Sequence, residues 1–267
     1  MMFVFQIIKE LSGNLHLIFR LASYDVKSRY QMHYLGILWQ LISPAAQVII
    51  FWFVFGLGIR GGAPIGDTPF FVWLIIGLIP WFFISSTIVQ GSNSVYAKIN
   101  IVSKMKFPVS ALPMITIVSN GFNLIIMLII LFAVLLAYNI YPNIYFIQFP
   151  YYLICLFIFL YAFALLSSTI TIMIRDFQLA LQSFIRMLFF LTPIFWDPSS
   201  LSETWQKILQ LNPFYYIILG FRNTLIFNEW FFEDISYLVY FWGITLIMLL
   251  IGSFIHIRFR NKFVDYL

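Results

Sequence analysis

The segment RDFQLALQSFIRMLFFLTPIFWDP, residues 175–198, combines the features of a membrane-spanning helix with features that interrupt one. Most of it is apolar, yet Arg175 and Asp176 open it and Arg186 follows further along. Pro193 lacks the backbone donor that a continuing helix needs, so the helix must end near it. The segment therefore predicts a short span, with Arg186 either snorkelling to the inner interface or pointing at a partner or an anionic ligand in a cavity.

The composition of the whole chain predicts a polytopic membrane protein. Hydrophobic residues make up 62% of the 267 residues and charged residues only 9%. A soluble domain averages about half apolar residues and a quarter charged ones. The apolar stretches are continuous, which is typical of helices and not of barrel strands. We therefore expect an all-α integral membrane fold in which residues 1–267 form a single transmembrane domain.

Six stretches are apolar enough to cross a bilayer, which takes about 20 residues of helix. They cover residues 38–58, 70–90, 111–137, 152–174, 179–196 and 237–256. A shorter stretch, 213–227, begins at Pro213. We interpret residues 198–230 as an external excursion of two short re-entrant helices, near 200–210 and 213–225, with Asn212 as the N-cap of the second.

The cations predict the orientation of the spans. Lys and Arg gather before the first span, between the second and third, and after the last, whereas most acids lie in the opposite segments. This distribution predicts six crossings with both termini in the cytoplasm. The net charge of +5 is not clustered into an extended basic surface, so it does not indicate nucleic-acid binding.

The N-terminal region, residues 1–37, is expected to lie in the cytoplasm and the membrane interface. Within residues 14–27, polar and basic side chains recur at helical spacing on one face. Such a helix lies in the plane of the interface. Lys27, Arg29 and His33 are then candidate contacts for lipid phosphates; the alternative is a simple membrane anchor.

Several kinds of chemistry are missing from the sequence. There is no GxxxxGK[ST] motif, the three histidines are scattered without metal-ligand spacing, and no acid lies in the middle of a span. We therefore expect no catalytic centre, no metal and no cofactor in this chain. If it is a transporter, another subunit must supply the energy.

Four stretches resemble the ABC-2-type permeases that export cell-surface polysaccharides. They are YLGILWQLISPAAQVIIFWFVFG at 34–56, GSNSVYAKINIVSKMKFPVSALP at 91–113, and RDFQLALQSFIRMLFFLTPIFW at 175–196 followed by LNPFYYIILGFRNTLI at 211–226. They follow one another in the family order and extend from residue 34 to residue 226 of the chain. The stretches WFVFGLGIRGGAPIGDTPFFVWLIIGLIPWFF, 52–83, and SKMKFP, 103–108, are most similar to the teichoic acid exporters of Gram-positive bacteria.

This resemblance implies a homodimer in the bacterial plasma membrane with two copies of a separate P-loop ATPase, which binds ATP and Mg. The complex would move undecaprenyl-diphosphate-linked wall teichoic acid from the inner to the outer leaflet. One alternative is an O-antigen or capsular polysaccharide exporter. An alternative from another class is an integral membrane enzyme acting on polyprenyl-linked glycans.

The resemblance also places a coupling loop for the ATPase at residues 91–110. We expect Tyr96, Ile99 and Ile101 to fill a groove on the ATPase, with Lys98 and Lys104 at its rim. The alternative is a basic loop that only fixes the topology.

Aromatic residues make up 21% of the chain, which is unusually high, and interfacial belts or packing account for some of them. Aromatic faces can stack on the C–H surfaces of sugar rings without holding a fixed register. On spans one and five, the candidates for a polymer channel are Phe51, Phe55, Phe189 and Phe195.

Overall fold

The computed structural model describes residues 2–30, 34–99 and 107–266 of the chain. Within these residues the fold is helical, with one isolated bridge between Ile65 and Thr68, so the expected all-α class is confirmed. The α-helices are α1 (Met2–Gly13), α2 (Leu15–Tyr30), α3 (Trp39–Phe51), α4 (Phe70–Ser92), α5 (Ser94–Ala97), α7 (Ala111–Ala137), α8 (Phe149–Met173), α9 (Asp176–Leu191), α10 (Glu203–Gln210), α11 (Pro213–Arg222) and α12 (Ile235–Phe259). A π-helical segment, Trp52–Ile59, extends α3, and another, Asn223–Phe227, extends α11.

Five helical segments of the described chain are long and apolar enough to cross a membrane. They are Trp39–Ile59, Phe70–Ser92, Ala111–Ala137, Ile144–Met173 and Ile235–Phe263. They correspond to the first four expected spans and to the sixth. The chain is therefore a multi-pass membrane protein.

The expected fifth span is shorter than the sequence predicted. Helix α9 has 16 residues, which is roughly 24 Å at 1.5 Å per residue, less than the hydrocarbon core of a bilayer. The expected end at residue 196 is wrong, because the helix stops at Leu191. Thr192 is extended, with φ −81° and ψ 131°, as the residue before a proline prefers to be.

The segment after α9 forms the two short helices that the sequence predicted. Asn212 caps α11, since its Oδ1 accepts a hydrogen bond from the Phe214 backbone N–H at 3.0 Å. Near its start, α11 packs Phe214 against Trp81 in the middle of α4. Near its end, Phe221 packs against Phe149, the first residue of α8. Helix α11 thus lies inside the bundle and runs from its middle toward one end.

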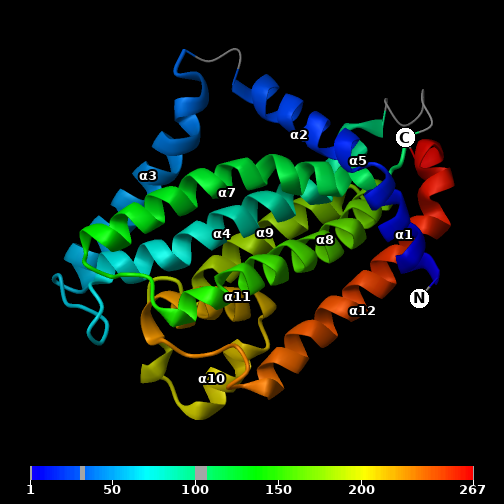
Figure 1. Ribbon diagram of the computed structural model, residues 1–267. Coiled ribbons are helices and arrows are strands. Elements are labelled where there is room, and N and C mark those ends of the chain that lie inside the picture. The colour runs from blue at the N-terminus through cyan, green and yellow to red at the C-terminus, as the bar shows by residue number, and fades with distance from the viewer. Residues whose placement is uncertain (1, 31–33, 100–106, 267) are drawn as a thin grey trace.

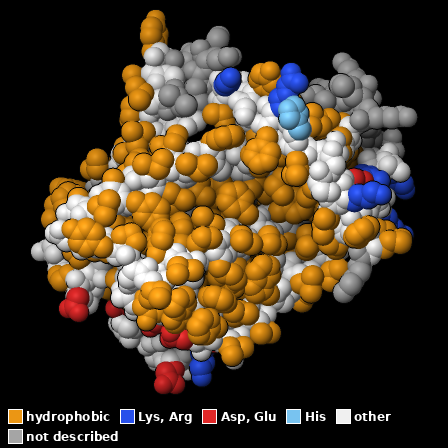
Figure 2. Space-filling model, viewed as in Figure 1, with side chains coloured by type: hydrophobic (Ala, Val, Ile, Leu, Met, Phe, Trp, Pro, Cys, Tyr) orange, Lys and Arg blue, Asp and Glu red, His pale blue; other side chains and the backbone are white. Residues whose placement is uncertain are grey.

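Helix α4 occupies the centre of the bundle and packs against α7, α8, α9 and α11. Helix α3, in contrast, diverges from the bundle toward its own N-terminus (Figure 1). Charged side chains lie at the two ends. Figure 2 shows Lys and Arg around α1 and α2, and acidic side chains over the end that carries α10. The face between them is apolar, which suits a surface in contact with lipid.

Candidate functional site

The amphipathic helix α2 packs along α7. Its residues Ile18 and Ala22 are buried in a small cluster with Leu112 and Ile115 of α7. The expected polar face, which includes His16, Arg20 and Lys27, is largely exposed. The helix that the sequence predicted is thus present, and part of its apolar face covers the bundle.

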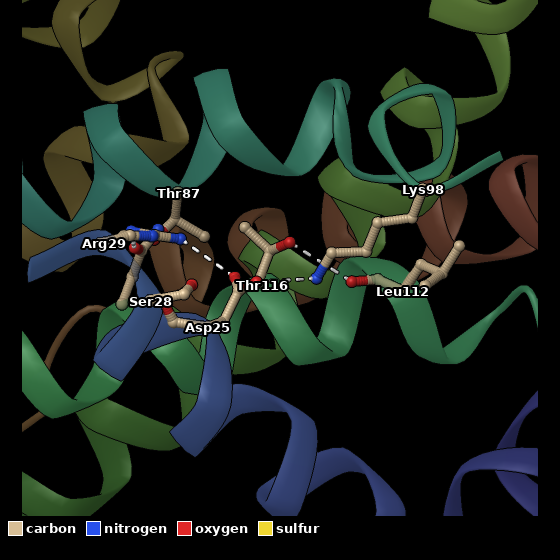
Figure 3. Close-up of polar contacts among 8 residues, drawn as sticks. Asp25, Ser28, Arg29, Thr87, Lys98, Leu112 and Thr116 are labelled. Carbon is tan, nitrogen blue, oxygen red and sulfur yellow. Dashed lines mark hydrogen bonds and ion pairs between the residues drawn. The ribbon is translucent and has the colours of Figure 1, made fainter. Parts of the chain in front are cut away.

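Asp25 of α2 connects this helix to the expected coupling loop. Its Oδ1 accepts a hydrogen bond from Lys98 Nζ at 3.1 Å, and its Oδ2 accepts one from Arg29 Nη2 at 3.3 Å. Figure 3 shows Asp25 between the two cations. In the sequence, Asp25 is the exception on the apolar side of its helix, and these two ion pairs explain why an acid occupies that position.

The polar contacts continue from Asp25 into the bundle. The Nη1 of Arg29 donates to Asn120 Oδ1 of α7 at 3.1 Å, and Asn120 Nδ2 donates to Thr87 Oγ1 of α4 at 3.3 Å. We call these residues, Lys98, Asp25, Arg29, Asn120 and Thr87, the relay network. Asn120 and Thr87 were missed from the sequence, although a buried amide in an apolar helix signals that a polar partner is nearby.

The other expected coupling residues have different surroundings. Tyr96 is half-buried, and the Arg175 guanidinium lies over its ring at 5.2 Å. Ile99 is only 5% exposed and packs inside the chain's own core, so its side chain is not presented to a partner in this structure, and its expected contact with an ATPase stays a prediction. Ile101, Lys104 and, among the phosphate candidates, His33 lie outside the described residues.

A polar groove of about 580 Å³ lies between α3, α4, α7 and α9. Gln182 and Arg186 line it from α9, and Ser85, Gln90 and Asn123 line it from α4 and α7. Arg186 is exposed and donates from Nε to the Gln182 carbonyl at 3.3 Å. Its Nη2 lies 3.5 Å from Ser183 Oγ, a long hydrogen bond, so Nη1 and the unused N–H of Nη2 are the donors left for a ligand in the groove. We call this the Arg186 groove.

A second cavity of about 390 Å³ shares Val89 and Gln90 with the Arg186 groove. Its other wall residues include Asp25, Arg29 and Gln178. Gln178 lies one turn before Gln182 on α9, so polar side chains follow one face of this helix from one cavity into the other. Of the expected phosphate contacts, Arg29 therefore lies on this polar path, whereas Lys27 is exposed and does not line either cavity.

The four aromatic residues expected in a channel lie together. Phe51 is 5.2 Å from Phe189, and Phe55 stacks on Phe195 at 4.3 Å between ring centroids. Phe189 and Phe195 are 5.6 Å apart, which closes the group. All four are half-buried, so in this conformation their faces pack mainly on one another.

Arg222 lies in the segment 198–230 that the sequence predicts to be external, but it is buried, with 1% of its surface exposed. It donates from Nη1 to the Pro193 carbonyl at 2.6 Å and from Nη2 to the Ile194 carbonyl at 2.7 Å. Its guanidinium stacks on the Trp73 ring at 3.7 Å. Arg222 thus satisfies carbonyls that the interruption at Pro193 leaves without helical partners, and an arginine in the apolar stretch 213–227 was the available signal for this role.

Known proteins match the part of the chain that contains these features. Residues 16–226 match the family model described as ABC-2 type transporter. The chain is 24% identical to an O-antigen export system permease of Myxococcus xanthus, over 97% of this chain and 98% of the relative. It is 27% identical to an O-antigen export system permease of Klebsiella pneumoniae, over 88% of this chain and 90% of that relative.

Proposed function

Because the chain belongs to the ABC-2 type transporter family, we propose that it is the membrane subunit of an ATP-driven exporter of a lipid-linked surface polysaccharide of the O-antigen kind. Members of this family are membrane subunits of transporters and normally work with an ATPase subunit. Under this proposal the chain itself is not an enzyme. ATP and Mg are bound by the separate ATPase.

The two kinds of exporter that the sequence predicts differ in the polymer that they carry. The local resemblance favours wall teichoic acid, but the relatives found over the length of the chain are O-antigen export permeases. We therefore propose an O-antigen type polymer and keep teichoic acid as the second candidate. The two differ chemically, because a teichoic acid backbone contains phosphodiesters and most O-antigen backbones consist of sugars alone.

The Arg186 groove is the observation that carries this proposal. An arginine within an apolar span is costly unless it meets an anion or water, and a guanidinium is well suited to binding a diphosphate. The amide and hydroxyl groups around it, such as Gln90, Asn123 and Ser85, pair with sugar hydroxyls. Arg29, in the adjoining cavity, is a second cation on the path from the basic end of the bundle.

The relay network gives this path a connection to the ATPase. We propose that residues 91–110 dock on the ATPase at the cytoplasmic face. A displacement of α5 would then act on α2 through Lys98 and Asp25, and on α7 and α4 through Arg29 and Asn120. Both termini lie at the cytoplasmic face in this topology. Helix α9 and the residues after it provide the fifth of the six crossings.

Helix α3 supports the proposal of a homodimer. Its outward side chains Ile50 and Phe53 are 58% and 64% exposed, and the Arg186 groove is bounded on one side by this helix. A second copy placed against α3 would complete the wall of a channel. In a Cys155→Ser background, Ile50→Cys should then cross-link two copies in membranes. A cysteine at Val239, on the exposed face of α12, is the matched control.

The proposal is tested by complementing a deletion strain with Arg186→Ala and Arg186→Lys. Arg186→Ala should remove most polymer from the cell surface and cause its lipid-linked form to accumulate inside. Arg186→Lys should be intermediate, because it keeps the charge without the bidentate geometry. Arg60→Ala, a change of an external arginine, should export normally. Normal export by Arg186→Ala would refute the role of the groove, and the phosphate-to-sugar ratio of the accumulated polymer decides between O-antigen and teichoic acid.

A further inference from the structure

A separate cavity of about 350 Å³ lies at the acidic end of the bundle. Its walls come from α8, α10, α11, the loop at 228–234 and the start of α12. The walls of the Arg186 groove come from α3, α4, α7 and α9, so the two sites share no residue. The size falls at the lower end of the range of about 300–1,000 Å³ that is usual for small-molecule sites.

Three carboxylates line this cavity. Glu233 Oε1 accepts a hydrogen bond from the Trp230 backbone N–H at 2.9 Å, and Asp234 Oδ1 accepts one from the Tyr237 N–H at 3.0 Å. No hydrogen bond or ion pair of the Glu229 carboxylate occurs among the described residues. Burial, followed by the nearby charge of Glu233, raises the pKa of Glu229. Glu229 thus offers free acceptor oxygens to a ligand.

Two further polar groups of the cavity lack partners. Tyr237 is 7% exposed, and its hydroxyl is buried without a hydrogen bond to any described residue. The Oδ1 of Asn223 is also buried and unpaired in the described part of the chain. Buried polar groups are nearly always hydrogen-bonded, because leaving one unpaired costs free energy. Both residues line the cavity, so a polar ligand that enters it can supply the missing partners once these side chains turn toward it.

The remaining walls are aromatic. Tyr152, Tyr216 and Trp230 line the cavity, and Tyr216 packs edge-on against Tyr237 at 5.0 Å. Aromatic faces beside hydrogen-bonding groups suit a sugar, whose ring has apolar C–H faces and hydroxyls at its rim. No Lys or Arg is among the described residues that line the cavity, so the site disfavours anionic sugars.

We propose that this cavity binds a neutral or amino-substituted pyranose unit of a surface glycan on the external side of the membrane. Glu229 and Asn223 accept hydrogen bonds from its hydroxyls, and the Tyr237 hydroxyl donates to or accepts from it. A metal ion is a poorer occupant, because no cluster of three or more His, Cys, Asp or Glu suited to a metal occurs in the described parts of the chain. The identification of the ligand as a glycan rests on the proposed function, whereas binding itself does not require transport.

The test is saturation-transfer NMR on the full chain in nanodiscs, with methyl α-glucopyranoside, methyl α-mannopyranoside and methyl α-glucuronide as probes. We expect millimolar binding of at least one neutral glycoside and none of the glucuronide. Tyr237→Phe and Glu229→Gln should each weaken binding by roughly fivefold, which is the loss of about one hydrogen bond. Glu203→Gln, an exposed acid of α10 outside the cavity, is the matched control and should bind normally.

Three results would overturn the proposal: no transfer to any neutral glycoside, equal binding of the glucuronide, or binding unaffected by both variants. Glu229 is exposed, so Glu229→Gln should not disturb the packing of the bundle. This variant therefore keeps the proposal testable if Tyr237→Phe misfolds. Arg186→Ala separates this site from the exporter, because it should abolish export and leave glycoside binding intact. Oligosaccharides cut from the exported polymer will compete if that polymer is the ligand. Binding without such competition assigns the site to another surface glycan.

Discussion

The first two spans, Trp39–Ile59 and Phe70–Ser92, are almost equally apolar but have opposite surroundings. In the most apolar 18 residues of each span, however, 11% are buried within the chain in the first and 78% in the second. Hydropathy places both in the bilayer, because it measures transfer from water and not contact with protein. The difference shows that the second span holds this fold together, whereas the first presents apolar surface to lipid or to a second copy.

The small and polar residues of α4 explain its central position. A Cβ atom on Gly77 would lie 3.1 Å from Arg222 Nη2, and one on Gly91 would lie 2.9 Å from the Cβ of Ala164. Close approach through small residues is the usual basis of helix packing in membranes, where apolar surface alone gives little preference for protein over lipid. In the π-helical extension of α3, a Cβ on Gly58 would have only the Phe53 carbonyl nearby, at 3.5 Å.

The largest effect on stability is expected from Arg222→Ala, which removes the buried guanidinium packed on α4. It leaves the Pro193 and Ile194 carbonyls without donors and a cavity beside Trp73. We expect the free energy of unfolding in detergent to fall by about 3–5 kcal/mol. Arg60→Ala, near the end of the first span, should change it by less than about 1 kcal/mol. If the two variants lowered the free energy of unfolding equally, the second span would contribute no more to the stability of the fold than the first.

A second test of the comparison makes the same substitution in each span: Gly91→Ala in the buried second span and Gly58→Ala in the exposed first span. The added methyl of Gly91→Ala meets Ala164, so the variant should lose about 1–2 kcal/mol of stability despite the higher helix propensity of alanine. Gly58→Ala should be neutral or slightly stabilising. The double variant Gly91→Ala with Ala164→Gly should recover part of the loss. No recovery would show that the close contact of α4 with α8 is not the cause.

These differences mark what the sequence could predict. The helical class, five of the six expected spans and the Asn212 cap follow from hydropathy, length and local capping rules, although the fourth span begins and the last one ends outside the expected bounds. The burial of Ile99 and the partners of Arg222 could not be predicted, because both depend on contacts between segments distant in the chain, although the apolar stretch around Arg222 signals a buried role for it. In a span that is apolar on all sides, periodicity does not show which face of the helix is buried. The hydrogen bonds of Asn120 in the relay network are therefore known only from the structure.

The four channel aromatics are an intermediate case. Span membership and aromatic character selected Phe51, Phe55, Phe189 and Phe195, and the structure brings all four together. Their exposure to a channel stays a prediction, since in the single chain they pack mainly on one another.

Asp25→Asn tests whether the relay network acts on the buried span. The ion pairs of Asp25 are partly exposed, so the loss of stability should be only about 0.5–1 kcal/mol. The neutral amide weakens the hold on both Lys98 and Arg29, and we expect polymer-stimulated ATPase activity of the complex to fall severalfold. The basal activity of the ATPase should stay unchanged. His16→Ala, an exposed change on the same helix, is the control. Normal stimulation in Asp25→Asn would show that α5 acts on α4 by another route.

The smallest effect is expected at Glu10 of α1, away from both spans. Its carboxylate accepts hydrogen bonds from Ser110 Oγ at 2.7 Å and from Arg260 Nη1 at 2.6 Å, which tie α1 to α7 and to the C-terminal segment. Burial alone would raise the pKa of Glu10, but these hydrogen bonds and the charge of Arg260 outweigh it and lower the pKa below 4.5. The lowered pKa means that this stabilisation is present above pH 4.5 and is lost as the pH falls through the folded-state pKa.

Comparing the wild type with Glu10→Gln from pH 7 down to pH 3 isolates this contribution, because the other titrating groups are common to both proteins. The difference in unfolding free energy should be about 0.5–1 kcal/mol at neutral pH and should vanish in acid. A difference that does not change with pH would mean that the Glu10 charge is not what stabilises this end. The acid sensitivity of the chain would then have to arise elsewhere, since the central span α4 contains no titrating carboxylate.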